Sequence, residues 1–214
     1  MPFENVLFDM DGTIVDSYEG ITKCVSFALS EFDIKTDDRN ALRVFIGPPL
    51  YEEFIEYAGF SHEQAQLAVK KYREHYNSGL YKDCKIYDGI EKLLIRLKEH
   101  GKKVFLATSK PEIMAKQILE YLKIEQHFDF IGGSEYDGGR HDKIDVLNYV
   151  IEENHLDISR SVMVGDRYHD IEGAKAFGMK SIGVLYGFGG REELEASGAD
   201  YIVENADQIL KIVL

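Results

Sequence analysis

The stretch Val6-Leu7-Phe8-Asp9-Met10-Asp11-Gly12-Thr13 places three apolar residues directly before a pair of aspartates. A short apolar run of this kind is typical of a buried strand in a parallel sheet. Asp9 and Asp11 are two residues apart on an extended segment, so their side chains point the same way, and the turn at Gly12 folds the chain back over them. We therefore expect a strand that carries two carboxylates at its carboxyl end, where ligands bind in open α/β sheets.

The chain after this strand changes its pattern twice. From residue 17 to about residue 82 apolar residues recur at helical spacing, as in Ile21, Cys24, Val25, Ala28 and Leu29, and no strand pattern interrupts them. After Asp88-Gly89, short apolar strands alternate with helices. The expected later strands are 104–107, 130–131, 161–164, 182–184 and 201–203.

This order of elements predicts an α/β fold, with a doubly wound, Rossmann-like parallel sheet and an inserted all-helical cap domain. We expect residues 1–16 and 83–214 to form the α/β core, and residues 17–82 to form the cap. A chain of 214 residues, 44% of them hydrophobic, is long enough for both parts.

The formal charge of −13 argues against a nucleic-acid or anionic-membrane partner, because binding either normally requires a basic patch. There is no apolar run of the roughly 18 residues that a membrane span needs, and no basic signal-like start, so we expect a cytoplasmic protein. Cys24 and Cys84 lack metal-ligand spacing and are expected to be reduced thiols.

A small phosphorylated metabolite is a suitable partner if a metal ion and a few cationic side chains overcome the negative field of the protein near the site. Whether the protein is a monomer or a homodimer is left open.

Three of the expected strands end in polar clusters, which are Asp9 to Thr13, Thr108-Ser109-Lys110, and Gly165 to Asp170. Neighbouring parallel strands would bring these ends into one crevice. Taken together, the clusters resemble the haloacid dehalogenase superfamily of phosphatases, in particular members similar to phosphoglycolate phosphatase and 5′-nucleotidases with an early helical cap. The resemblance covers essentially the whole chain.

This resemblance implies a division of roles between the two aspartates. Asp9 would be the nucleophile that forms an aspartyl-phosphate, and Asp11 would protonate the leaving oxygen and then activate water. Thr108 and Ser109 would hold the phosphate at the start of the following helix, although many relatives have Asn at the position of Ser109. Lys143, which lies just before a helix, resembles the family lysine that contacts both nucleophile and phosphate.

The resemblance also implies a Mg²⁺ site. Magnesium favours hard oxygen ligands, and Asp9, the Asp11 backbone carbonyl and Asp166 match that preference. Asp170 and Thr13 would support these ligands, for example by orienting Asp166 or a metal-bound water. Arg140 and Lys110 are rivals of Lys143 for a phosphate contact.

Substrate choice is expected to lie in the cap, where Arg43 and Gly47 belong to a segment that resembles a cap loop facing the active site in this family. Arg43 would bind a carboxylate or phosphate of the substrate, or it would form a surface ion pair. The glycine-rich stretch Gly187 to Gly190 lacks the lysine and hydroxyl residue of a phosphate loop, and we expect it to form a turn near the site.

We therefore predict Mg²⁺-dependent hydrolysis of a small phosphomonoester. A dehalogenase would have no use for Asp11 as acid and base. A mutase similar to β-phosphoglucomutase, or a phosphonatase with a Schiff-base lysine at Lys23, Lys70 or Lys71, ranks below hydrolysis. A non-catalytic module that senses a phosphate ligand would be expected to have lost one of the four key residues, and all four are present: Asp9, Asp11, Lys143 and Asp166.

Overall fold

The computed structural model describes residues 3–136 and 139–214. The chain forms two compact units, one from Met1–Val15 with Ile86–Leu214 and the other from Asp16–Lys85. The cap range expected from the sequence, 17–82, lies inside the second unit.

The first unit contains a six-stranded sheet. Its strands are β1 (Asn5–Phe8), β4 (Lys103–Pro111), β5 (Phe130–Ser134), β6 (Ser161–Gly165), β7 (Lys180–Val184) and β8 (Tyr201–Val203). Their order is β5-β4-β1-β6-β7-β8, and every neighbouring pair is parallel. This arrangement confirms the predicted doubly wound α/β core.

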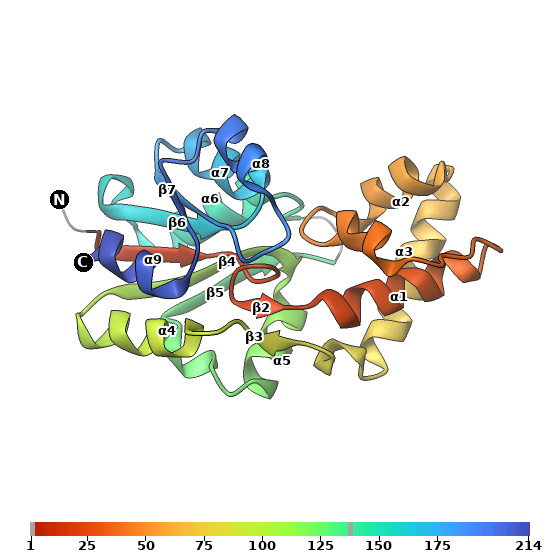
Figure 1. Cartoon of the computed structure of the whole chain (residues 1–214), viewed down its shortest axis with the longest axis horizontal. Coiled ribbons are helices and arrows are strands. Elements are labelled where there is room, and N and C mark those ends of the chain that lie inside the picture. Colours follow the sequence, from red (N-terminus) through yellow and green to blue (C-terminus); the bar gives the residue numbers. More distant parts are fainter. Residues whose placement is uncertain (1–2, 137–138) are drawn as a thin grey trace. The chain divides into compact units, whose positions relative to one another are not determined.

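Helices cover both faces of this sheet (Figure 1). One face carries α6 (Lys143–Asn154), α7 (Tyr168–Ala176) and α8 (Arg191–Ser197), and the other carries α4 (Ile90–Glu99), α5 (Glu112–Tyr121) and α9 (Ala206–Val213). The short 3-10 turns η3 (Glu125–His127) and η4 (Ile158–Arg160) lie in connections. The helices form where apolar residues recur every three or four positions; in α4 these residues are Ile90, Leu93, Leu94 and Leu97, and all four are buried.

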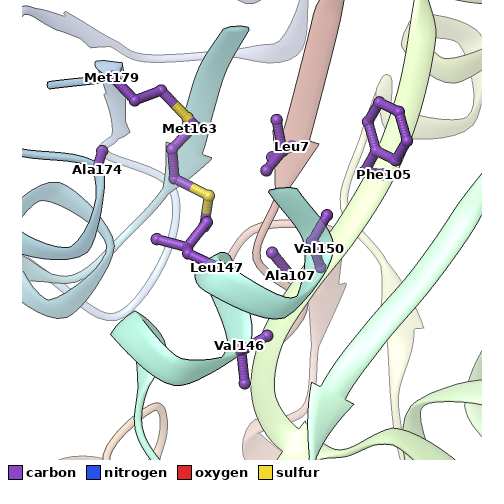
Figure 2. Close-up of a cluster of buried hydrophobic side chains, with 9 residues drawn as sticks. All are labelled: Leu7, Phe105, Ala107, Val146, Leu147, Val150, Met163, Ala174 and Met179. Atoms are coloured by element: carbon purple, nitrogen blue, oxygen red, sulfur yellow. The ribbon is translucent and has the colours of Figure 1, made fainter. Parts of the chain in front are cut away.

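A buried apolar cluster lies between the sheet and helices α6 and α7 (Figure 2). Leu7 of β1 is in register with Phe105 of β4 and with Met163 of β6. These three side chains pack with Leu147 and Val150 of α6. Burying an apolar side chain of this size contributes about 1.5–3 kcal/mol. The cluster therefore fixes the register of β1, β4 and β6, and with it the relative positions of the residues that follow these strands.

The second unit is helical. It consists of α1 (Tyr18–Ser30), the 3-10 helix η1 (Arg39–Phe45), α2 (Leu50–Ala58), α3 (His62–Asn77) and the 3-10 turn η2 (Leu80–Lys82). The two-residue strands β2 (Val15–Asp16) and β3 (Lys85–Ile86) pair in a separate small sheet where the chain passes from one unit to the other. The sequence did not predict this pair, because two residues are too few to show a strand period.

Among residues 3–136 and 139–214, no helix combines the length and the apolar character that crossing a membrane requires.

Candidate active site

The site begins at the carboxyl end of β1, which is the point where the strand order of the sheet reverses. From β1 the chain proceeds to β4 and β5 on one side, and to β6, β7 and β8 on the other. Ligands of open α/β sheets bind at such switch points. The backbone N–H of Asp9 continues the pairing by donating to Val164 of β6 at 2.9 Å. Gly12 then turns the chain with a φ of 90°, a conformation that favours glycine.

Asp9 and Lys143 form a buried ion pair at this point. The Lys143 Nζ donates to Asp9 Oδ1 at 2.6 Å and to the carbonyl of Ala107 at 2.8 Å. It also lies 2.8 Å from Asp170 Oδ1. Burial raises the pKa of Asp9 to about 6, although Lys143 opposes the shift. Burial acts against the charge of Lys143, but the carboxylates of Asp170 and Asp9 outweigh it and raise its pKa.

Three buried carboxylates gather beside this lysine. Asp9, Asp166 and Asp170 each place an oxygen within 4.8 Å of the other two. Asp166 Oδ2 accepts from the backbone N–H of Phe188 at 2.7 Å, and its Oδ1 accepts from Thr13 Oγ1 at 3.4 Å. Burial, together with the charges of Asp170 and Asp9, raises the pKa of Asp166 well above its usual range. The ionised cluster is therefore costly unless a further cation lies within it.

The residues at this cluster suit a Mg²⁺ ion. Asp11 is also buried, so four carboxylates face two buried ammonium groups, those of Lys143 and Lys110, with an excess of two negative charges when all are ionised. Magnesium has this charge and favours carboxylate oxygens. Asp170 Oδ2 accepts from the N–H of Arg167 at 3.1 Å and its Oδ1 pairs with Lys143. These contacts with Lys143 and with the start of α7 fit the supporting role expected for Asp170.

The residues after Ala107 differ from the expected pattern. We predicted that Thr108, Ser109 and Lys110 would follow the strand, but β4 extends to Pro111 with a register shift between Thr108 and Pro111. Hydrogen bonds to β5 keep this irregular end in the sheet. Thr108 is buried, and its Oγ1 accepts from the N–H of Lys110 at 3.3 Å. The carbonyl of Ser109 accepts from Ser134 Oγ at 2.7 Å.

The three candidate cations occupy different places. Lys143 contacts Asp9, as described above, whereas Lys110 donates to Asp11 Oδ2 at 2.8 Å. Arg140 forms ion pairs with Glu112 and Glu135. The guanidinium of Arg140 therefore pairs with neighbouring loop and helix residues, so of these three candidates only the two lysines contact carboxylates of the site. The contact between Lys110 and Asp11 was not predicted, because the register shift in β4 that directs Lys110 has no sequence pattern of its own.

The glycine-rich stretch after β7 packs directly against Asp166. A Cβ atom at Gly187 would lie 2.4 Å from the Asp166 Cβ, and one at Gly189 would meet the Asp166 carbonyl. A Cβ at Gly12 would likewise clash with the carboxylate of Asp166. These glycines allow backbone to surround Asp166 closely and supply the N–H of Phe188. The glycine-rich stretch was expected to form a turn near the site. In the structure it packs against Asp166 and donates a backbone N–H to its carboxylate.

The two cap residues lie in the second unit. Arg43 is exposed and belongs to η1, and Gly47 has a φ of 108° after that helix. Their predicted part in substrate binding remains a prediction.

Comparison with known proteins agrees with this geometry. Residues 6–184 match the model of a family described as haloacid dehalogenase-like hydrolase, which is most of the chain. The chain belongs to this family. A 5′-nucleotidase from Pseudomonas aeruginosa is 42% identical over 91% of this chain and 88% of its own length. A solved structure of a predicted phosphatase from Clostridium acetobutylicum is 44% identical, with a TM-score of 0.96 over 99% of this chain and 98% of that chain.

Within the haloacid dehalogenase-like hydrolases, this chain is a phosphatase. A tyrosine-protein kinase PtkA from Mycobacterium tuberculosis is also similar, with 34% identity over 94% of this chain and 68% of its own length. The resemblance expected from the motifs is therefore confirmed at the level of the family and the enzyme class.

Proposed function

We propose that this haloacid dehalogenase-like phosphatase hydrolyses a small phosphomonoester through an aspartyl-phosphate on Asp9, with Mg²⁺ as its cofactor. The observation that carries the proposal is the arrangement around Asp9, a buried carboxylate paired with Lys143 beside the acidic cluster. A buried cluster of this kind, assembled from the ends of β1 and β6 and the start of α7, is costly for the fold and is typical of a functional site.

In the first step, an oxygen of Asp9 attacks phosphorus and the bond to the leaving oxygen breaks. Lys143 holds the Asp9 carboxylate and offers positive charge next to the incoming phosphate. Asp11 gives its proton to the leaving oxygen, so that the product departs as an alcohol. Thr108 and the N–H groups around Ser109 are the proposed donors to the phosphate oxygens.

In the second step, water attacks the phosphorus of the aspartyl-phosphate. Asp11, now a carboxylate, takes the proton of that water, and the Asp9 carboxylate is regenerated as phosphate leaves. Asp9, Asp166 and the Asp11 backbone carbonyl are the proposed Mg²⁺ ligands, with Asp170 and Thr13 holding Asp166 and Lys143 in place. When bound, Mg²⁺ would neutralise charge on the phosphate oxygens.

The substrate is proposed to be a small phosphorylated metabolite such as phosphoglycolate or a nucleoside 5′-monophosphate. The similarity to a 5′-nucleotidase supports the nucleotide. Arg43 and Gly47 of the cap are the proposed selectors. A phosphotransferase similar to β-phosphoglucomutase is the alternative, and it would transfer the phosphoryl group to a second sugar phosphate instead of water.

The test is turnover of p-nitrophenyl phosphate with and without Mg²⁺, followed by a panel of phosphoglycolate, AMP and sugar phosphates compared by kcat/KM. We expect EDTA to abolish turnover and Mg²⁺ to restore it. Asp9→Asn, which lacks the nucleophilic oxygen, should be inactive by several orders of magnitude. Turnover that persists in EDTA, or in the Asp9→Asn variant, would contradict the proposed site.

A further inference from the structure

The irregular end of β4 places a lysine against the proposed acid and base, and three local features hold it there. Ser134 Oγ donates to the carbonyl of Ser109, and Thr108 Oγ1 accepts from the N–H of Lys110. In β5, a Cβ at Gly133 would lie 2.6 Å from the carbonyl of Lys110, so glycine is needed for the approach. Irregular strand ends beside active sites are a known way to redirect a side chain.

The redirected side chain forms a buried ion pair. The Nζ of Lys110 donates to Asp11 Oδ2 at 2.8 Å, and the two side chains are only 6% and 9% exposed. The other oxygen, Asp11 Oδ1, is buried and makes no hydrogen bond with a described residue. A buried oxygen without a partner is costly and points to a ligand atom that completes it. The two oxygens of Asp11 are therefore not equivalent.

From this asymmetry we infer that Lys110 is a positioning residue for the leaving-group proton, which makes Asp11 Oδ1 the oxygen that carries it. Lys110 occupies Oδ2 and fixes the carboxyl plane, so that Oδ1 alone faces the reacting atoms. As the P–O bond breaks, the proton moves from Oδ1 to the leaving oxygen and Asp11 becomes a carboxylate that Lys110 stabilises. In the second step Oδ1 receives the proton of the attacking water. This inference rests on the proposed function.

The inference predicts that the need for Lys110 depends on the leaving group. p-Nitrophenolate is a good leaving group that departs with little protonation, whereas the alkoxides of AMP or phosphoglycolate require a proton in the transition state. The parameter kcat/KM reports steps up to transfer of the phosphoryl group to Asp9, where Asp11 acts as acid. Hydrolysis of the aspartyl-phosphate is common to both substrates and affects kcat alone.

The experiment compares wild type, Lys110→Met, Lys110→Arg and the control Lys116→Met, which removes an exposed lysine paired with Glu112 on α5. For each, kcat/KM is measured with p-nitrophenyl phosphate and with AMP or phosphoglycolate, whichever the wild type turns over faster. We expect Lys110→Met to lower the alkyl value on the order of 100-fold and the aryl value less than about 10-fold. Lys110→Arg, which keeps a cation, should retain most of the alkyl activity, and Lys116→Met should match wild type.

Two results would overturn the inference. Equal losses for both substrates would mean that Lys110 binds the phosphate itself or only supports the fold, and an unchanged alkyl value would mean that Asp11 needs no partner. If Lys110→Met does not fold, as judged by thermal unfolding, Lys110→Gln provides the same ratio of alkyl to aryl activity. A wild type that hydrolyses neither ester with Mg²⁺ would instead contradict the proposed function, so the two failures are distinguishable.

Discussion

At the scale of single residues, the site is marked by four buried carboxyl groups, which are costly to ionise away from water. Lys143 is the residue that offsets most of this cost, since one ammonium group contacts Asp9, Asp170 and the carbonyl of Ala107. Buried ion pairs of this type contribute little net stability, because removing both charges from water costs about as much as their attraction returns. Their retention is therefore better explained by chemistry at Asp9 than by stability. Among the residues that the structure describes, no lysine forms an ion pair with Asp166, and burial raises the pKa of its carboxyl well above the usual range.

This raised pKa predicts the effect of replacing Asp166 by Asn. The pKa of Asp166 is raised in the folded protein, so its ionised form at neutral pH destabilises the fold, and the amide avoids this cost. Without metal at pH 7.5, we expect Asp166→Asn to be more stable than the wild type, on the order of 1 kcal/mol, because the amide carries no charge that burial disfavours. Below the raised pKa the wild-type carboxyl is neutral too, so the advantage should shrink as the pH falls. Thermal unfolding of both proteins in EDTA, from pH 7.5 to lower pH, measures this difference in stability.

The control for that prediction is Asp157→Asn, because Asp157 is an exposed carboxylate remote from the cluster whose pKa is lowered by Ser159. This control should gain no stability in EDTA. Adding Mg²⁺ should raise the Tm of the wild type and of Asp157→Asn, and should raise that of Asp166→Asn far less. An Asp166→Asn variant that is less stable than wild type in EDTA at pH 7.5 would show that the cluster is not strained by its charge.

At the scale of secondary-structure elements, the site is assembled from strand ends and from one loop. The loop after β7 surrounds Asp166 with backbone, which a side chain at Gly187 would prevent. No positive φ restricts Gly187 or Gly190, so substitutions at these positions are limited by contacts alone. The two glycines therefore form a matched pair, since a Cβ at Gly190 would meet no atom within 4 Å.

We predict that Gly187→Ala displaces the Asp166 carboxylate and weakens Mg²⁺ binding. A Cβ atom 2.4 Å from the Asp166 Cβ and from the carbonyl of Gly12 forces a shift of backbone or ligand. The Mg²⁺ concentration for half-maximal turnover should rise on the order of 10-fold, and stability should fall by about 1–3 kcal/mol. Gly190→Ala should change neither quantity. Similar Mg²⁺ curves for the two variants would rule out a role of the loop in holding Asp166.

At the scale of the whole molecule, the order of elements was predictable from the sequence because buried strands and amphipathic helices have distinct periods. The six strands of the main sheet coincide with apolar runs that are visible in the sequence. The ends of elements were less predictable. The extension of β4 to Pro111 depends on Gly133 and Ser134 of a neighbouring strand, which are distant in sequence. The pair β2 and β3 was too short to be seen.

The candidate site shows the same division. Asp9, Lys143 and Asp166 could be named from motifs, because each stands at a strand end or helix start of a recognisable pattern. The contact of Lys110 with Asp11 could not be, since a lysine after a strand is usually solvated and only the three-dimensional course of β4 directs it inward. The close packing of Gly187 against Asp166 could not be predicted either, because the two residues are distant in sequence and only the folded structure brings them together.

The central claim is that Asp9 is the residue that becomes phosphorylated, and trapping the intermediate tests it most directly. The enzyme is mixed with p-nitrophenyl phosphate and Mg²⁺, quenched, and treated with borohydride, which reduces an aspartyl-phosphate to homoserine. Mass spectrometry of the peptide that contains Asp9 and Asp11 then locates the change. We predict homoserine at position 9, and none when substrate is omitted. Homoserine at position 11 or elsewhere, or turnover with an unmodified Asp9, would contradict the account.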